Sequence, residues 1–174
     1  MIHILTKNKG KFDVAKKALA PMKVEQCFLD IPEIQADTSA EIAKTAAVAA
    51  AKRLNAPVIK EDHSLIITSL GIPGPYTQFI ERKMPVEVLL KAMSNFADRT
   101  GHFELALCYA EPDGTSKEFS YRVPITVAKK AKGTSKGWDQ ILMLKGETRT
   151  FAEYPESERT VWDKNYVALK KVLG

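Results

Sequence analysis

Residues 2–19 read IHILTKNKGKFDVAKKAL. The apolar residues 2–5 predict a short strand, and the polar residues 6–11 predict a loop that leads into a helix ending before Pro21. The helix is indicated by five apolar residues: Phe12, Val14, Ala15, Ala18 and Leu19. A strand, a polar loop and a helix in this order are typical of the start of an α/β fold.

The same alternation continues along the chain. Residues 24–29 predict a second strand, and either Thr38 or Ser39 can cap a long helix. The apolar stripe of that helix is almost all alanine, which allows close packing: Ile42, Ala43, Ala46, Ala47, Ala50, Ala51 and Leu54. Residues 57–67 predict a third extended segment, interrupted by two acids, before a turn-rich stretch.

The second half adds further strands and helices. Residues 76–93 predict two short helices separated by a proline, and alternation at 103–109 and 119–123 predicts a hairpin. A basic loop follows at 129–137, and a last helix aligns Trp162, Tyr166, Leu169 and Leu173 on one face. No repeat or linker interrupts residues 1–174, so we expect a single α/β domain with a mixed sheet.

Composition excludes several classes of protein. The 174 residues are 45% hydrophobic and 27% charged, which is typical of a soluble globular protein. No apolar run is long enough for a membrane span or a signal peptide, so we expect a cytoplasmic protein. The net charge of +5 is compatible with a phosphate-bearing ligand but is weak evidence for nucleic acid. The two cysteines and three histidines show no metal-ligand spacing, so any metal should have oxygen ligands.

Thr6, Asn8 and Lys11 lie between the first strand and its helix. The free N–H groups and the dipole at a helix N-terminus favour an anion, and hydroxyl, amide and ammonium groups can complete a phosphate site. The glycine-lysine-serine signature of a Walker loop is absent. The alternative interpretation is helix capping beside solvated lysines.

Three acids lie at the end of a predicted strand or in the passage from a strand to a helix. Glu61 and Asp62 are adjacent in the third extended segment, and Glu33 lies between the second strand and the long helix. Neighbouring carboxylates repel one another unless a cation neutralises them, and Mg²⁺ takes such ligands while it holds substrate phosphates. The alternative is a set of solvated acids.

Trp138 and Asp139 follow the basic loop. Tryptophan can stack on a base or a sugar, and aspartate can accept a hydrogen bond from a base N–H or a ribose hydroxyl. A tryptophan is more often part of the core, which is the alternative interpretation here.

Taken in order, these motifs resemble the inosine triphosphate pyrophosphatase family, also called the Ham1 family. The resemblance rests on six stretches: residues 6–11 (TKNKGK), 31–35 (IPEIQ), 57–62 (PVIKED), 70–76 (LGIPGPY), 137–139 (GWD) and 150–153 (TFAE). It implies an elongated mixed β-sheet with flanking helices and two lobes around a central cleft. It also implies a homodimer that hydrolyses a nucleoside triphosphate to the monophosphate and pyrophosphate with Mg²⁺.

The resemblance implies roles for individual residues. The phosphate-binding residues would be Thr6, Asn8 and Lys11. Lys7 departs from the family, which usually has glycine there, and we expect it to add one positive charge. The metal-binding carboxylates would be Glu33, Glu61 and Asp62; the adjacent pair would be catalytic, with Asp62 orienting or deprotonating the attacking water. Trp138 and Asp139 match the base and ribose side, and Arg159 stands where the family has a lysine.

The chain departs from the family at several ligand contacts. The family's closing Ser-His-Arg, which recognises the purine 6-oxygen, is replaced by Asp163, Lys164 and Asn165. The stacking aromatic is replaced by Lys136, and the phosphate-contacting helix lysine by Ala46. We therefore expect substrate contacts from Lys164 and Asn165 and an altered or relaxed base preference.

Sequence alone leaves two alternatives to a pyrophosphatase. One is a non-catalytic nucleotide- or phosphate-binding relative with the same fold. The other is a nucleic-acid-binding module that uses the lysines of residues 129–136, which is less favoured because no aromatic residues alternate with those charges. No specific nucleic acid and no membrane are therefore expected as partners.

Overall fold

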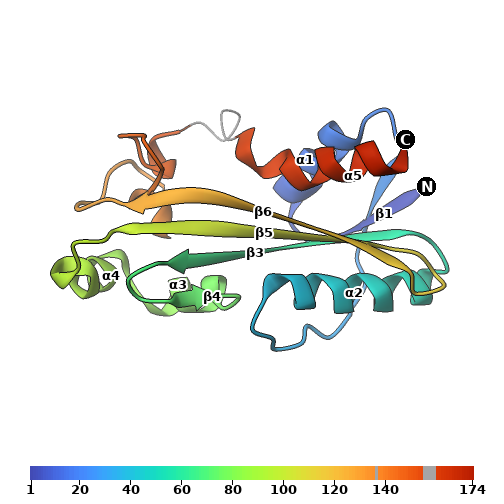
Figure 1. Ribbon diagram of the computed structural model, residues 1–174, viewed down its shortest axis with the longest axis horizontal. Coiled ribbons are helices and arrows are strands. Elements are labelled where there is room, and N and C mark those ends of the chain that lie inside the picture. Colours follow the sequence, from blue (N-terminus) through green and yellow to red (C-terminus); the bar gives the residue numbers. More distant parts are fainter. Residues whose placement is uncertain (136, 155–159) are drawn as a thin grey trace. The chain divides into compact units, whose positions relative to one another are not determined.

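A computed structural model describes residues 1–135, 137–154 and 160–174. Within them, a mixed sheet of seven strands has the order β2-β1-β3-β5-β6-β7, and β4 pairs with β3 (Figure 1). This sheet with flanking helices confirms the predicted α/β fold. The chain forms two compact units: Met1–Asp62, Leu105–Tyr121 and Val161–Gly174 make the first, and His63–Glu104 and Arg122–Thr160 make the second.

The first unit begins with the predicted strand, loop and helix. β1 (Ile2–Leu5) is followed by α1 (Lys9–Leu19), and β2 (Val24–Cys27) pairs with β1 in parallel. β1 also pairs in parallel with β3 (Val58–Ile67). The two acids do not interrupt β3, which is a single strand of ten residues.

Helices cover both faces of the strands in the first unit (Figure 1). α2 (Ser39–Leu54) lies on one face, where its alanines pack with Leu5, Val58 and Cys108. α1 and α5 (Lys164–Leu173) lie on the other. That face has the buried residues Ile4, Ala15, Leu19, Ile59, Leu107, Tyr109, Tyr166 and Leu169. Side chains alternate along a strand, so Val58 and Ile59 enter opposite cores.

The second unit contains the predicted pair of short helices, α3 (Thr77–Lys83) and α4 (Val86–Ala92). β4 (Ile72–Gly74) pairs antiparallel with the end of β3, and β7 (Leu142–Leu144) pairs antiparallel with β6. β5 (Thr100–Ala110) and β6 (Ser116–Val127) are sheet neighbours joined by a turn at residues 111–115, which confirms the predicted hairpin.

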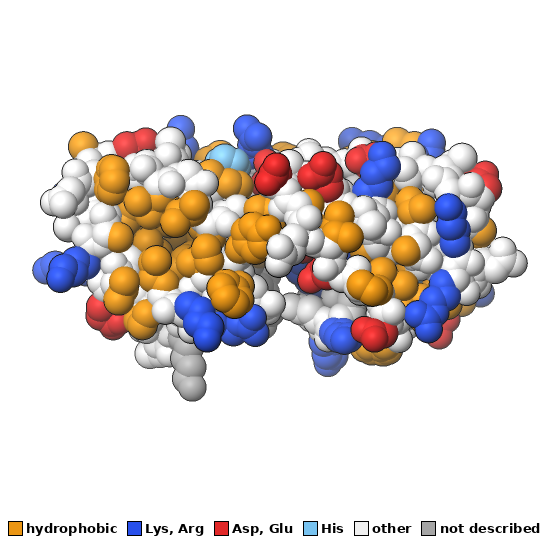
Figure 2. Space-filling view, turned by 90° about the horizontal axis from the view of Figure 1, so that it is seen from below, with side chains coloured by type: hydrophobic (Ala, Val, Ile, Leu, Met, Phe, Trp, Pro, Cys, Tyr) orange, Lys and Arg blue, Asp and Glu red, His pale blue; other side chains and the backbone are white. Residues whose placement is uncertain are grey.

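Hydrophobic side chains also gather on the surface of the second unit, where α3, α4 and β4 lie (Figure 2). The exposed large hydrophobic residues between positions 72 and 96 are Ile72, Tyr76, Phe79, Val88 and Phe96. Exposed apolar surface that gathers in this way is typical of contact sites. In the part of the chain that the structure describes, no helix has the length and apolar character needed to cross a membrane.

Candidate active site

The parallel strands of the first unit bring the predicted phosphate and metal residues to one edge of the sheet. Leu5 is paired with Cys27 where β1 and β2 end, and Ile4 is paired with Ile59. Two residues further along, this register places Thr6 level with Glu61. In open α/β sheets, ligands bind outside the carboxyl ends of the strands.

Thr6 and Asn8 shape the N-terminus of α1. Asn8 is the cap, and its Oδ1 accepts a hydrogen bond from the backbone N–H of Lys11 over 3.1 Å. The hydroxyl of Thr6 accepts from the backbone N–H of Asn8, also over 3.1 Å. The capping interpretation is therefore confirmed for Asn8, while phosphate binding by this loop stays a prediction. Lys7 is exposed.

Lys11 carries a cation that is poorly solvated. Burial lowers the pKa of its ammonium, and the negative charges of Glu61 and then Asp62 act in the opposite direction. Desolvation disfavours the charged form, so a further anion near this ammonium stabilises it. The Lys11 ammonium is therefore suited to contact a phosphate group of a ligand.

Glu61 and Asp62 point to opposite faces of β3. Glu61 is 7% exposed and lies on the face covered by α1 and α5, where the hydroxyl of Tyr166 donates to its Oε2 over 3.1 Å. Burial, and then the charge of Glu61, raise the pKa of Tyr166 well above its usual value, so the phenol keeps its proton and donates. The adjacent acids therefore occupy different environments.

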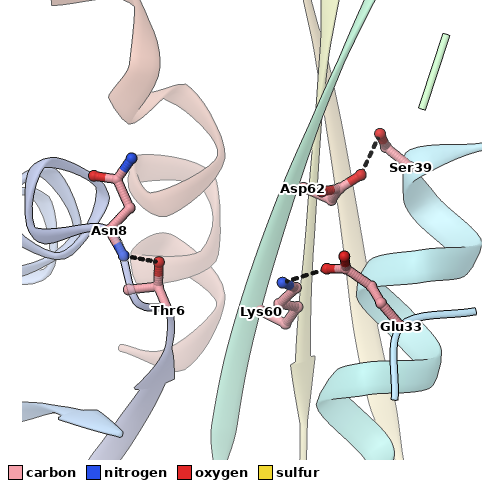
Figure 3. Close-up of polar contacts among 6 residues, drawn as sticks. All are labelled: Thr6, Asn8, Glu33, Ser39, Lys60 and Asp62. Carbon is pink, nitrogen blue, oxygen red and sulfur yellow. Dashed lines mark hydrogen bonds and ion pairs between the residues drawn. The ribbon is translucent and has the colours of Figure 1, made fainter. Parts of the chain in front are cut away.

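Asp62 faces α2. The hydroxyl of Ser39, the first residue of α2, donates to Asp62 Oδ2 over 2.7 Å (Figure 3). Ser39 is fully buried, whereas Asp62 is only half-buried. The carboxylate is thus held at one oxygen by a rigid element and retains contact with solvent.

Glu33 lies in the loop between β2 and α2, as predicted. Its Oε1 is 3.1 Å from the ammonium of Lys60, and its side chain is 63% exposed. Lys60 is two residues before Asp62 and lies on the same side of β3 (Figure 3). Glu33 and Asp62 therefore share the α2 side of the strand, and Lys60 is the cation already present there.

The carboxylates suit a metal ion that is also held by its substrate. Among the described residues, no three His, Cys, Asp or Glu side chains are grouped to hold a metal by themselves. Mg²⁺ rarely needs such a group, because it keeps several waters and binds one or two carboxylates together with substrate phosphates. Asp62, with an oxygen besides the one that Ser39 holds, fits that requirement.

Trp138 and Asp139 lie in the second unit, in a short 3-10 helix over Gly137–Gln140. The indole of Trp138 is 2% exposed and donates to the carbonyl of Met84 over 2.9 Å. Its backbone N–H donates to Glu81 Oε1 over 2.8 Å. The structure thus places Trp138 in the core, the alternative interpretation from its sequence, and leaves Asp139 half-buried beside it.

The first turn of α5 carries Lys164 and Asn165. Asn165 is 2% exposed, and its Nδ2 donates to the carbonyl of Leu105 over 2.7 Å. Its amide therefore ties α5 to β5, whereas sequence reasoning assigned it to the base. The Lys164 side chain is 48% exposed and lies 4.0 Å from Asp163 Oδ1. Arg159 and Lys136 lie outside the described residues.

Comparison with known proteins identifies the family. Residues 2–174 match the sequence model of the Ham1 family. The chain belongs to the Ham1 family. It is 36% identical over 158 residues to a dITP/XTP pyrophosphatase of Methanopyrus kandleri, covering 88% of this chain and 84% of that protein. It is 28% identical over 161 residues to an inosine triphosphate pyrophosphatase of Puccinia graminis, covering 92% of this chain and 83% of that protein.

Solved structures of Ham1 proteins share the fold. A HAM1 protein from Coxiella burnetii superposes with a TM-score of 0.84 at 21% identity, covering 99% of this chain and 98% of that one. The Ham1 protein of Staphylococcus aureus gives a TM-score of 0.80 at 24% identity, with the same coverage. These likenesses confirm the predicted fold class.

Sequence reasoning missed the partners of the Ham1 motif residues. Ser39 was considered only as a helix cap, and Tyr166 only as a core residue of the last helix. Lys60 and Glu81 were not singled out, although each contacts a predicted site residue or its backbone. One sequence signal could have indicated a polar partner for Ser39. It is the polar residue at the start of an otherwise alanine-rich buried stripe.

Proposed function

We propose that this chain is a nucleoside triphosphate pyrophosphatase that uses Mg²⁺ and cleaves purine nucleoside triphosphates with a relaxed base preference. The products are the nucleoside monophosphate and pyrophosphate. Membership in the Ham1 family supports this activity, as do relatives named dITP/XTP pyrophosphatase and inosine triphosphate pyrophosphatase. The observation that carries the proposal is the half-buried Asp62 carboxylate, held by Ser39 at the carboxyl edge of the parallel strands.

Asp62 orients the attacking water and accepts its proton. Release of pyrophosphate requires water to attack the α-phosphorus, with the α–β bridging oxygen leaving on the pyrophosphate. A carboxylate within hydrogen-bond reach of the water supplies general-base catalysis, for which Asp62 has both the charge and the access to solvent.

Asp62 and Glu33 would hold Mg²⁺ together with substrate phosphates. The ion, when bound, neutralises the charge that develops on the phosphate oxygens and the leaving group. Metal binding by Glu33 would open its ion pair with Lys60, and that ammonium would then be available to a phosphate. For Glu61 we propose a supporting role, because its buried carboxylate is held by Tyr166 on the opposite face.

Lys11 and the N-terminus of α1 would bind the phosphate chain. The N-terminus of α1, which begins after the Asn8 cap, carries the positive end of the helix dipole, and the desolvated ammonium of Lys11 supplies positive charge. Thr6 keeps the loop in shape through its bond to Asn8, and exposed Lys7 adds a solvated charge.

Base recognition rests on fewer contacts than in a site with dedicated pairing groups. Asp139 and Arg159 are the proposed contacts to base and ribose, and Trp138 supports Asp139 from the core. Of the two residues proposed on α5, only Lys164 has an exposed side chain. A freely rotating ammonium discriminates less between a purine carbonyl and an amino group than a planar arginine does.

A panel of ITP, XTP, GTP and ATP with Mg²⁺ tests the function. We expect release of pyrophosphate and monophosphate, with a kcat/KM for ITP only modestly above that for ATP, because no dedicated buried pairing penalises the wrong base. Release of orthophosphate would refute the proposed reaction. Nucleotide binding without hydrolysis would favour the non-catalytic alternative, which no contact in the described residues favours.

A homodimer and a cytoplasmic location stay predictions. Sedimentation analysis of the purified chain would test the first, and fractionation of cells that express it would test the second.

A further inference from the structure

The buried hydroxyl of Ser39, at the start of α2, contacts a carboxylate on β3. Its Oγ donates to Asp62 Oδ2 over 2.7 Å, although the two residues are 23 positions apart in sequence. Thr38 performs the capping instead, with its side chain accepting from the backbone N–H of Glu41 over 3.3 Å. The helix therefore has its cap without the Ser39 hydroxyl.

Ser39 is the polar member of the buried set of α2. The other buried residues of α2 are isoleucine and alanine: Ile42, Ala43, Ala46, Ala47, Ala50 and Ala51. Alanine is the better helix former, and a buried hydroxyl costs free energy unless it is hydrogen-bonded. The contact with Asp62 meets that requirement and accounts for a serine where packing alone would favour alanine.

α2 holds Ser39 in a fixed position for its contact with Asp62. It has 16 residues, and its alanine stripe packs against Leu5, Val58 and Cys108 of the strands. A carboxylate held from such an element keeps one orientation, whereas a half-buried aspartate on a strand can otherwise change rotamer. Engagement of Oδ2 also determines where Oδ1 points.

We propose that Ser39 is a positioning residue for Asp62. Its hydroxyl fixes the carboxylate in the orientation in which Asp62 holds the attacking water, and it acts on the reaction only through Asp62. This inference rests on the proposed function. A hydroxyl that served packing alone would affect stability and leave kcat unchanged.

The test compares Ser39→Ala, Ser39→Thr and wild type in pyrophosphate release from ITP, with thermal unfolding measured on the same samples. Ser39→Ala removes one oxygen and introduces no clash, and we expect kcat to fall about 10–100-fold, as for other partners of catalytic or ligating carboxylates. KM for ITP should stay within about threefold, because the lost interaction acts on the chemical step. Ser39→Thr keeps the hydroxyl and should restore most of kcat.

Ser69→Ala is the matched control. Ser69 is a part-buried serine of the second unit whose hydroxyl contacts Met93 Sδ at 3.6 Å, and its loss should leave kcat unchanged. If wild type hydrolyses no nucleotide, the proposed function fails. If wild type is active and Ser39→Ala keeps its kcat, or loses activity only as far as it unfolds, the positioning role alone is overturned. Equal losses in Ser39→Ala and Ser39→Thr would also overturn it, since packing would then explain both.

Discussion

The two adjacent acids on opposite faces of β3 differ in burial and in the group that donates a hydrogen bond to them. Glu61 is buried beneath α1 and α5 with a phenol as its donor, whereas Asp62 is half-buried beside α2 with a serine as its donor. The phenol comes from α5 and the serine from the first turn of α2, and both residues are fully buried. Neighbouring carboxylates thus need not share one metal, because strand geometry separates them.

Trp138 and Asp139 are a second pair of adjacent residues of which one is buried and the other half-buried. Trp138→Ala should lower the free energy of unfolding by about 3–5 kcal/mol, because it empties a buried site and leaves the Met84 carbonyl without its indole donor. Asp139→Ala should change stability little and raise KM for ITP. Urea unfolding and steady-state kinetics of both variants check this. A strongly destabilised Asp139→Ala would show that Asp139, like Trp138, serves stability.

Tyr166→Phe probes the Glu61 face. The change removes only the hydroxyl and leaves a buried carboxylate without that donor, so we expect a loss of about 1–3 kcal/mol in the free energy of unfolding. Tyr121→Phe, at an exposed tyrosine, is the control and should lose almost nothing. If Tyr166→Phe instead kept full stability and lost activity, Glu61 would belong to the chemistry and our division of the two faces would be wrong.

Alkaline pH probes the same contact. The pKa of Tyr166 is raised in the folded chain, while an unfolded tyrosine titrates near pH 10. The unfolded state therefore loses this proton first, and the stabilisation, complete below about pH 10, declines as the pH rises above it. Urea unfolding between about pH 9 and 11 should show a shallower decline for Tyr166→Phe than for wild type. Identical slopes would mean that the phenol titrates normally.

Glu33→Gln probes the Asp62 face and has the smallest expected effect. Glu33 is exposed and forms an ion pair with Lys60. Loss of its negative charge should therefore raise the Mg²⁺ concentration for half-maximal activity several-fold and leave kcat at saturating Mg²⁺ nearly unchanged. Glu41→Gln, at another exposed acid, is the control. Superimposable Mg²⁺ titrations of Glu33→Gln and wild type would show that Glu33 does not bind the metal.

Local sequence patterns predicted most of the fold. The strand, loop and helix of residues 2–19, the alanine stripe of α2 and the two short helices before and after Pro85 all appear in the structure. The grouping of Thr6, Glu33 and Asp62 into one site came from the family resemblance and stays a prediction. The local patterns did not predict that β3 runs through Glu61 and Asp62 without a break.

The missing information was tertiary. Tyr166 is 105 residues from Glu61 in sequence, and its apolar neighbours on α5 gave the pattern of an ordinary core helix. Asn165 was likewise predicted to contact the ligand, whereas its amide donates to the Leu105 carbonyl. No periodicity encodes such partners, because they depend on which elements pack together.

A side-by-side assay of Asp62→Asn and Glu61→Gln tests the division of the two faces most directly. Asp62→Asn keeps size but removes the charge that activates water, so pyrophosphate release from ITP should fall about 10²–10⁴-fold with an unchanged unfolding temperature. Glu61→Gln still accepts from Tyr166 and should retain kcat within about tenfold, with its main effect on stability. Full activity in Asp62→Asn, or a collapse of activity in a well-folded Glu61→Gln, would contradict the assignment of hydrolysis to the α2 face of β3.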